Sequence, residues 1–412
     1  MNNSSNSSKQ DYQVWPVFLL AFIRLFYVSI FDRALSNYLY FNIGIRESTL
    51  GFISSAGALS YIVAPVLGQM LTKKIGLRNA LILNSALTPV LSGAQILYSA
   101  PLFLIICRVG LGLSMGLFWP NCLYLLSKWQ RVSTVKRSKK NFALFNFSWN
   151  SGFILGLLVG FIFTFSWDDY LTMIISWVLS FLLIPVSFFI AKESKSPDVK
   201  EKLIYQTEDP ISHLDIEEDL IINSHTPMIV FPILFSWLGI MHLAISKSIL
   251  AFGYPFVLKA SALSDKSYLT YLVQGGMQLT QLISLTLMNS MKVYARKIAS
   301  ILSILGLSIL ALAIILVENI LYISILIACA GLLLGFIHGT SMKIMLEYGT
   351  AKQSTKYSII NEILIGIAFG FTPIIAGYVA EVNLYYNYLY IIIVGLCIFF
   401  ASLYIARNVK RH

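Results

Sequence analysis

Seven ionisable side chains stand inside segments that are otherwise apolar. The stretch "FIRLFYVSIFDRALSNY" (22–38) carries Arg24, Asp32 and Arg33 among Phe, Leu and Ile. The others, further along the chain, are Arg108, His242, Lys247 and His338. An ionisable group deep in a membrane costs at least roughly 2.5 to 3.5 kcal/mol, so it faces a partner or an aqueous cavity. Bases in such places can bind an anionic group, and a carboxyl group can take up and release a proton.

The charges of the first segment gather on one side of a helix. At about 100° per residue, Asp32 and Arg33 share an arc of roughly 100° with Ser29 and Ser36, and Arg24 lies at its margin. Two interpretations stay open. In one, the bases bind the anionic group of a ligand and Asp32 takes up a proton. In the other, Asp32 pairs with Arg24 or Arg108 and only fixes helix packing.

The composition predicts that these ionisable groups lie on apolar, membrane-spanning helices. Of 412 residues, 57% are hydrophobic and 12% are charged, which is far from the range of a soluble domain. Runs of about 20 apolar residues predict an all-α membrane protein and are too long for barrel strands. We predict about twelve spans, near residues 14–40, 48–72, 77–99, 101–127, 142–165, 169–191, 228–258, 266–290, 298–317, 320–346, 357–380 and 385–406.

The net charge of +11 does not indicate nucleic-acid binding, because the charges lie in the connections between spans. Their positions instead indicate the membrane topology. Lys and Arg concentrate in alternate connections, around residues 73–78, 128–140, 292–297 and 352–356. The positive-inside rule then predicts that both termini are cytoplasmic, in a protein integral to the cell membrane.

The chain divides into two pseudo-symmetric six-helix halves. We predict a disordered cytoplasmic tail (1–13), a first half (14–191), a cytoplasmic linker (192–227), a second half (228–406) and a basic tail (407–412). An offset of about 218 residues aligns Gly57 with Gly275 and Arg24 with His242, so each half offers a base towards the pseudo-symmetry axis. A parallel repeat of six spans is a transporter architecture, with its ligand site near mid-membrane between the halves.

Two motifs carry a family resemblance. The segment "GQMLTKKIGLRNAL" (68–81) resembles the hallmark loop of the major facilitator superfamily, and the matching or nearby residues are Gly68, Lys73, Lys74, Gly76 and Arg78. The segment "RVGLGLSMGLFWP" is similar to the superfamily's Arg-xxx-Gly motif through Arg108 and Gly112. The acidic residue of the loop is replaced by Lys73 or Thr72.

The resemblance implies the fold of that superfamily and its cavity-lining helices. These are the first, fourth, seventh and tenth, and they make cavity residues of Arg24, Asp32, Arg108, Lys247 and His338. In the superfamily the acid of the loop helps to hold the cytoplasmic ends of the halves together. Here Glu362 is a candidate partner of Lys73, Lys74 or Lys343. Independent interfacial charges in contact with water are the alternative.

These observations predict a secondary active transporter that works by alternating access. It would be proton-coupled or an exchanger, a symporter or an antiporter, and the bases favour an organic anion or acidic metabolite. A multidrug or sugar transporter, or a non-transporting sensor of the same fold, stays open. We expect no enzyme activity, cofactor or metal, because neither a catalytic constellation nor a nucleotide-binding Gly-Lys-Ser/Thr loop is present in the sequence. The expected partners are the bilayer, a small-molecule substrate and protons, and we expect a monomer.

Overall fold

A computed structural model describes residues 14–132, 135–190, 233–347 and 351–407. The described residues form helices and their connections, with no strand among them, which confirms the predicted all-α class. The predicted tail 1–13 and linker 192–227 lie outside the described residues, as do residues 408–412 of the predicted basic tail.

The first half begins with the long helix α1 (Trp15–Asn37), which continues into one π-helical segment, η1 (Tyr38–Ile43). Next come α2 (Glu47–Tyr61) and α3 (Ala64–Ile75), which are bent by 50° at their junction. Pro65 in the first turn of α3 accounts for the break, because proline has no N–H and its ring clashes with the preceding turn. The remaining helices are α4 (Leu77–Leu97), α5 (Pro101–Met115), α6 (Trp119–Val132), α7 (Val135–Ser166), α8 (Asp169–Ser180) and α9 (Leu183–Phe188).

The second half repeats this order. Its helices are α11 (Ile233–Ala260), the short η3 (Ser264–Lys266), α12 (Leu269–Ser290), α13 (Val293–Leu316), α14 (Ile320–Glu347), α15 (Ala351–Val382) and α16 (Tyr386–Arg407). The 218-residue offset, applied to the first residues of α4, α5 and α8, predicts the starts of α13, α14 and α16 within two residues. The internal repeat therefore extends from sequence to helix boundaries.

Ten helical segments among the described residues are long and apolar enough to cross a membrane, or eleven when the bent pair α2 and α3 counts as one. These correspond to eleven of the twelve predicted spans. The remaining span, predicted at residues 266–290, corresponds to α12. This helix has 22 residues, but it is not apolar enough to be counted among the membrane-crossing segments. Its polar residues include Gln274, Gln278 and Gln281.

The outside of the bundle is apolar. Large hydrophobic side chains are more than half exposed on several helices, among them Phe147 and Phe165 of α7, Ile309 of α13 and Phe400 of α16. A water-soluble monomer rarely exposes apolar surface on this scale. Together with the spans, this surface identifies an integral membrane protein whose outer face contacts lipid.

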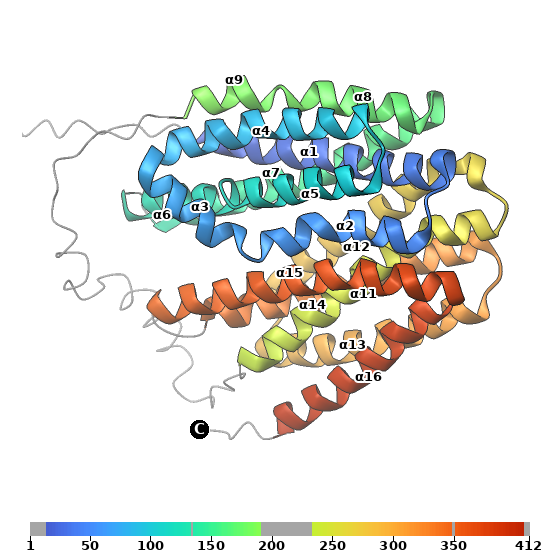
Figure 1. Ribbon diagram of the computed structural model, residues 1–412. Coiled ribbons are helices and arrows are strands. Elements are labelled where there is room, and N and C mark those ends of the chain that lie inside the picture. The colour runs from blue at the N-terminus through green and yellow to red at the C-terminus, as the bar shows by residue number, and fades with distance from the viewer. Residues whose placement is uncertain (1–13, 133–134, 191–232, 348–350, 408–412) are drawn as a thin grey trace, which may run out of the picture.

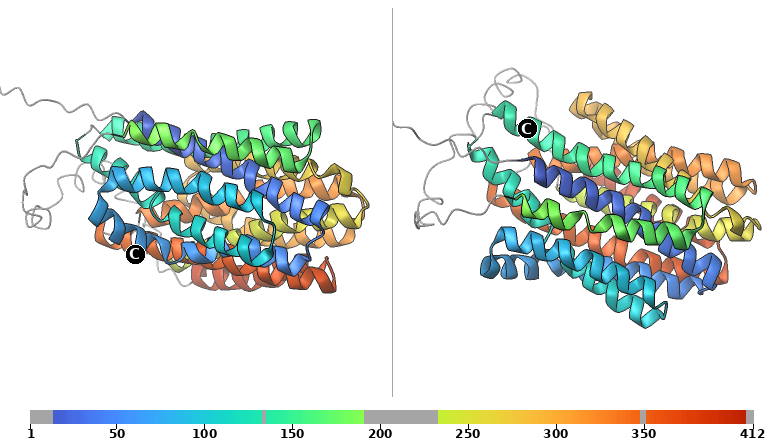
Figure 2. Two further views of the ribbon diagram at one scale, coloured as in Figure 1. Left: turned by 45° about the horizontal axis from the view of Figure 1, so that its top comes forward. Right: turned by 90° about the horizontal axis from the view of Figure 1, so that it is seen from above.

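The two halves lie side by side, and the helices follow a common long direction in all three views (Figures 1 and 2). They meet where α2 packs on α15 and α7 packs on α12. We call the end of the bundle where α9 ends and α11 begins the linker end. The opposite end carries the α1–α2 and α11–α12 connections, and we call it the loop end (right in Figure 1).

Candidate functional site: charged groups inside the bundle

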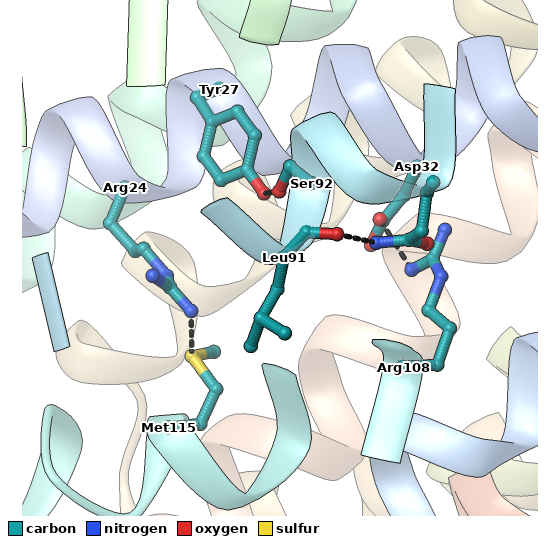
Figure 3. A network of polar contacts seen from close by, with 8 residues as sticks. Arg24, Tyr27, Asp32, Leu91, Ser92, Arg108 and Met115 are labelled. Atoms are coloured by element: carbon teal, nitrogen blue, oxygen red, sulfur yellow. Dashed lines mark hydrogen bonds and ion pairs between the residues drawn. The ribbon is translucent and has the colours of Figure 1, made fainter. Parts of the chain in front are cut away.

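Arg24 of α1 is buried in the interior of the first half (Figure 3). Its guanidinium donates hydrogen bonds to Thr88 Oγ1 of α4 and to Met115 Sδ of α5, and it lies 5.8 Å from the ring centroid of Phe118. These neighbours are neutral, and Arg24 has no salt bridge to a described residue. One helical turn further, the hydroxyls of Tyr27 and Ser92 are hydrogen-bonded at 2.5 Å, again joining α1 to α4.

Asp32 forms an ion pair with Arg108, which joins α1 to α5 (Figure 3). Nη1 of Arg108 lies 2.6 Å from Oδ1 of Asp32. The Asp32 side chain is 45% exposed and that of Arg108 only 12%. The carboxyl is thus the more accessible partner, and the guanidinium depends on the carboxylate for its counter-charge.

Lys247 of α11 projects towards α12. Its Nζ donates to Gln278 Oε1 at 2.6 Å and to Gln281 Oε1 at 2.9 Å. Gln281 Nε2 in turn lies 3.3 Å from Nδ1 of His338 on α14, so one amide contacts both bases. Lys247 makes no salt bridge to any described carboxylate. An ammonium has three N–H donors, and two of them are taken by these glutamine oxygens.

Arg33 crosses from the first half to the second. Its Nε donates to Gln274 Oε1 at 2.9 Å, its Nη2 donates to the same oxygen, and its Nη1 donates to the carbonyl of Ala251 at 3.1 Å. Deeper in the bundle, Gln278 Nε2 reaches Asn150 Oδ1 of α7 at 3.5 Å. These bonds form a seam between the halves on the α12 side.

Arg24 and His242, which the repeat predicts to offer bases towards the pseudo-symmetry axis, each contact residues of their own half. His242 is fully buried beside Ser246 and Gly395 of α16, and it interacts with the backbone of Ile304 on α13. Arg24 turns in the same way towards α4, the helix that the offset aligns with α13. The repeat is preserved, and both bases are buried among neutral neighbours of their own half.

The three glutamines of α12 were not recognised in the sequence as site residues. Gln274, Gln278 and Gln281 follow one another at intervals of four and three, which places them on one face of a helix. They bind Arg33 and Lys247, cations that the sequence did single out. The spacing of these amides within a predicted span was the available signal.

The loop motif stands at the linker end and shapes two helix junctions. Gly76 ends α3 with φ of +84°, a conformation that favours glycine. Lys73 and Lys74 are exposed in the last turn of α3, and Arg78 Nη2 donates to the carbonyl of Phe188 at 2.9 Å. Gly68 faces the backbone of Gly116, so α3 and α5 approach closely there.

Glu362 of α15 interacts with the hydroxyl of Tyr61 on α2. This contact also crosses between the halves, from α2 to α15. Among described residues it forms no salt bridge with Lys73 or Lys74, the two loop lysines predicted as its partners. The lysines are exposed beyond the bend between α2 and α3, whereas Tyr61 ends α2 before it.

Gly112 allows α5 to pack directly on α2, and this contact gives a stability prediction. A Cβ at Gly112 would lie 2.9 Å from the carbonyl carbon of Gly57 and would also overlap Ser60. We expect Gly112→Ala to destabilise the protein by roughly 1 to 3 kcal/mol, the usual range for overpacking. The thermal unfolding midpoint of the purified protein measures this. Gly253→Ala is the matched control, since a Cβ there meets only the Tyr388 hydroxyl at 4.0 Å; equal midpoints would contradict the prediction.

No group of three or more His, Cys, Asp or Glu side chains able to hold a metal ion occurs in the described part of the chain. The buried polar side chains of the described residues include bases, amides, hydroxyls and the carboxylate of Asp169, and the Asp32–Arg108 ion pair joins two helices. A two-half bundle with such groups on its inner helices is the architecture of a membrane transporter.

The chain belongs to the Major Facilitator Superfamily, whose family model matches residues 17–273. This confirms the resemblance of the two sequence motifs. No curated protein matches the sequence.

Solved transporters share the fold over nearly their whole length. The nucleoside transporter NupG is 13% identical with a TM-score of 0.68, covering 96% of this chain and 99% of that one. A D-xylose-proton symporter is 16% identical with a TM-score of 0.68, covering 97% and 98%. A bacterial homolog of the human lysosomal transporter Spinster, in an inward-facing and unoccupied conformation, is 10% identical with a TM-score of 0.68, covering 95% and 98%. At these identities the likeness shows the fold alone.

Proposed function

We propose that this protein is a secondary active transporter, not an enzyme, and that it carries a small organic anion across the cell membrane by alternating access. The observation that carries the proposal is Lys247, a cation inside a membrane span whose recorded partners are neutral amides. An unpaired charge in a span is expensive. A transported anion would supply the missing counter-charge.

Gln278 and Gln281 orient the Lys247 ammonium for binding an anion. Gln278 and Gln281 fix the ammonium through their side-chain oxygens, which leaves one N–H for an incoming carboxylate or phosphate oxygen. A hydrogen bond between charged groups is shorter and stronger than one between neutral groups. His338, linked to Lys247 through Gln281, adds a second base near the same place.

The ion pair of Asp32 and Arg108 supports proton coupling as the driving mechanism. Protonation of Asp32 would remove the counter-charge of Arg108 and loosen the contact between α1 and α5. A partly exposed carboxyl can be protonated from solvent. Exchange of one substrate molecule for another would use the same binding groups but would not need protonation of Asp32. Loss of Asp32 therefore distinguishes proton-coupled transport from exchange.

The positions of Lys and Arg in the sequence favour a cytoplasmic linker end and cytoplasmic termini. With that orientation, the loop end, where Arg33 and Glu381 join the halves, faces outward. We propose a monomer, since each chain supplies both halves of the site.

Lys247→Ala tests the substrate class. Loss of one charge-assisted hydrogen bond corresponds to about 1.5 to 3 kcal/mol, so we expect anion affinity to fall by roughly 10- to 100-fold. Purified protein would be screened against a panel of carboxylates and phosphate esters by thermal shift, and affinity for the best ligand would then be compared between wild type and variant. Arg78→Ala, at the linker end, is the control. An unchanged affinity in Lys247→Ala would return Lys247 to a structural role.

A neutral polyhydroxy solute is the second candidate. Gln278, Gln281 and Asn150 provide amide donors and acceptors that suit hydroxyl groups. The similar solved structures include transporters named for a nucleoside and for D-xylose. Uptake into proteoliposomes under an imposed pH gradient separates the candidates, because anions and sugars would be offered in parallel. No flux with either panel would favour a sensor.

A further inference from the structure

A small cavity lies between the two halves at the loop end. Its volume is about 260 Å³, and its walls include Tyr40 and Glu47 from the first half and Phe256, Lys259 and Leu384 from the second. Lys259 lies twelve residues beyond Lys247 on α11, or about 18 Å along a helix with a rise of about 1.5 Å per residue. The cavity is therefore separate from the cation site around Lys247.

Two opposite charges line this cavity without pairing. The Tyr40 hydroxyl donates to Glu47 Oε1 at 2.8 Å, and the Lys259 ammonium lies 4.2 Å from the centroid of the Tyr40 ring. Among described residues, Glu47 and Lys259 form no salt bridge with each other or with a third group. Glu47 thus keeps its second oxygen, and Lys259 keeps its N–H donors, for a ligand in the cavity.

The rest of the wall is apolar. The rings of Phe256 and Tyr40 form a T-shaped pair with centroids 5.0 Å apart, and Leu384 and two alanines complete the lining. A purely anionic ligand would face Glu47 and a purely cationic one would face Lys259. A ligand with a positive group, a negative group and a short apolar group can contact Glu47, Lys259 and the apolar wall at the same time.

We propose that this cavity binds a small apolar zwitterion of the α-amino acid type, with its ammonium on Glu47 and its carboxylate on Lys259. The proposal stands on its own contacts and does not depend on the identity of the transported substrate. Because both halves supply walls, the site exists only while they are together at the loop end. The bound zwitterion therefore holds this end closed and slows any conformational cycle that must open it.

Leucine and two analogues test the proposal on the purified full-length protein. Isopentylamine lacks the carboxylate of leucine, and isocaproate lacks its ammonium, while both keep the apolar chain. We expect millimolar leucine to raise the thermal unfolding midpoint in a saturable way, and neither analogue to do so at the same concentration. No shift with leucine, alanine or phenylalanine, or an equal shift with an analogue, would overturn the proposal.

Charge-removing variants then locate the site. Glu47→Gln and Lys259→Gln should each weaken leucine binding at least about tenfold. Asp265→Asn and Lys266→Gln are the controls: they also remove one negative and one positive charge at the loop end, but both residues lie outside the cavity lining. These two variants should leave leucine binding unchanged. Lys247→Ala should also leave it unchanged, even where anion binding is lost. Leucine binding that survives both cavity variants but fails in Lys247→Ala would assign the ligand to the other site and refute this one.

Discussion

Replacing Asp32 by Asn is expected to abolish proton-driven flux while substrate exchange continues. The amide cannot take up a proton, and it leaves the Arg108 guanidinium, which is only 12% exposed, without its carboxylate partner. Exchange needs the substrate site and the motion of the halves, but no net proton movement. Two assays on the same proteoliposomes measure the difference: uptake under an imposed pH gradient, expected at background, and counterflow at equal pH, expected within a few-fold of wild type.

Two further variants separate coupling from packing at this position. Asp32→Glu keeps a titratable carboxyl group and should restore part of the pH-driven uptake. Arg108→Lys keeps the charge pair with a shorter reach and should retain stability. If Asp32→Asn transports under a pH gradient as well as wild type, Asp32 has no coupling role. If both assays fall together with the unfolding midpoint, the ion pair serves the packing of α1 on α5.

A second large effect is expected at Gly51, where the halves touch through their backbones. A Cβ at this position would lie 3.0 Å from the carbonyl carbon of Pro373 and 3.2 Å from Cα of Ile374, and would overlap the Pro373 carbonyl oxygen. Both neighbours are backbone atoms of α15 and cannot move aside alone. Gly51→Val should therefore force α2 away from α15. At roughly 1 to 3 kcal/mol of overpacking, the ratio of molecules with a joined loop end to molecules with a separated one falls by about 5- to 150-fold.

Distances between spin labels at Asn42 and Asp265 report this change directly. Both positions are exposed, Asn42 in η1 of the first half and Asp265 in η3 of the second. The exposed cysteines Cys329 and Cys397 would first be replaced by Ser, so that only the introduced cysteines are labelled. We expect a longer distance and slower transport in Gly51→Val. Gly112→Ala is the comparison, because it crowds a contact inside the first half; a longer distance there too would point to general unfolding.

Much of the fold could be predicted from the sequence because it depends on hydropathy and periodicity. Apolar runs gave the helices, and the 218-residue offset anticipated helix starts in the second half. The bend between α2 and α3 was not anticipated, although Pro65 was visible. The helix α12 was predicted as a span at residues 266–290, and the effect of its glutamines was not anticipated.

The candidate site was predicted less completely, because residue type alone does not determine which neighbour a side chain meets. The repeat predicted bases towards the pseudo-symmetry axis at Arg24 and His242, and the structure adds that each contacts neighbours within its own half. Two possible partners were named for Asp32, and the geometry selected Arg108. Arg33 was grouped with Asp32 by helical angle, but its length carries it across to Gln274. Such choices depend on tertiary contacts between distant segments.

The polarity of α12 also bears on how the chain enters the bilayer during synthesis. A helix with Gln274, Gln278 and Gln281 on one face partitions poorly into lipid on its own, and Lys247 makes α11 costly as well. The two helices are joined by a short connection, and the Lys247 ammonium binds two of these glutamines. Inserted as a hairpin, each helix masks the polar groups of the other. The contact of Lys247 with these amides thus favours the insertion of α11 and α12 as a pair.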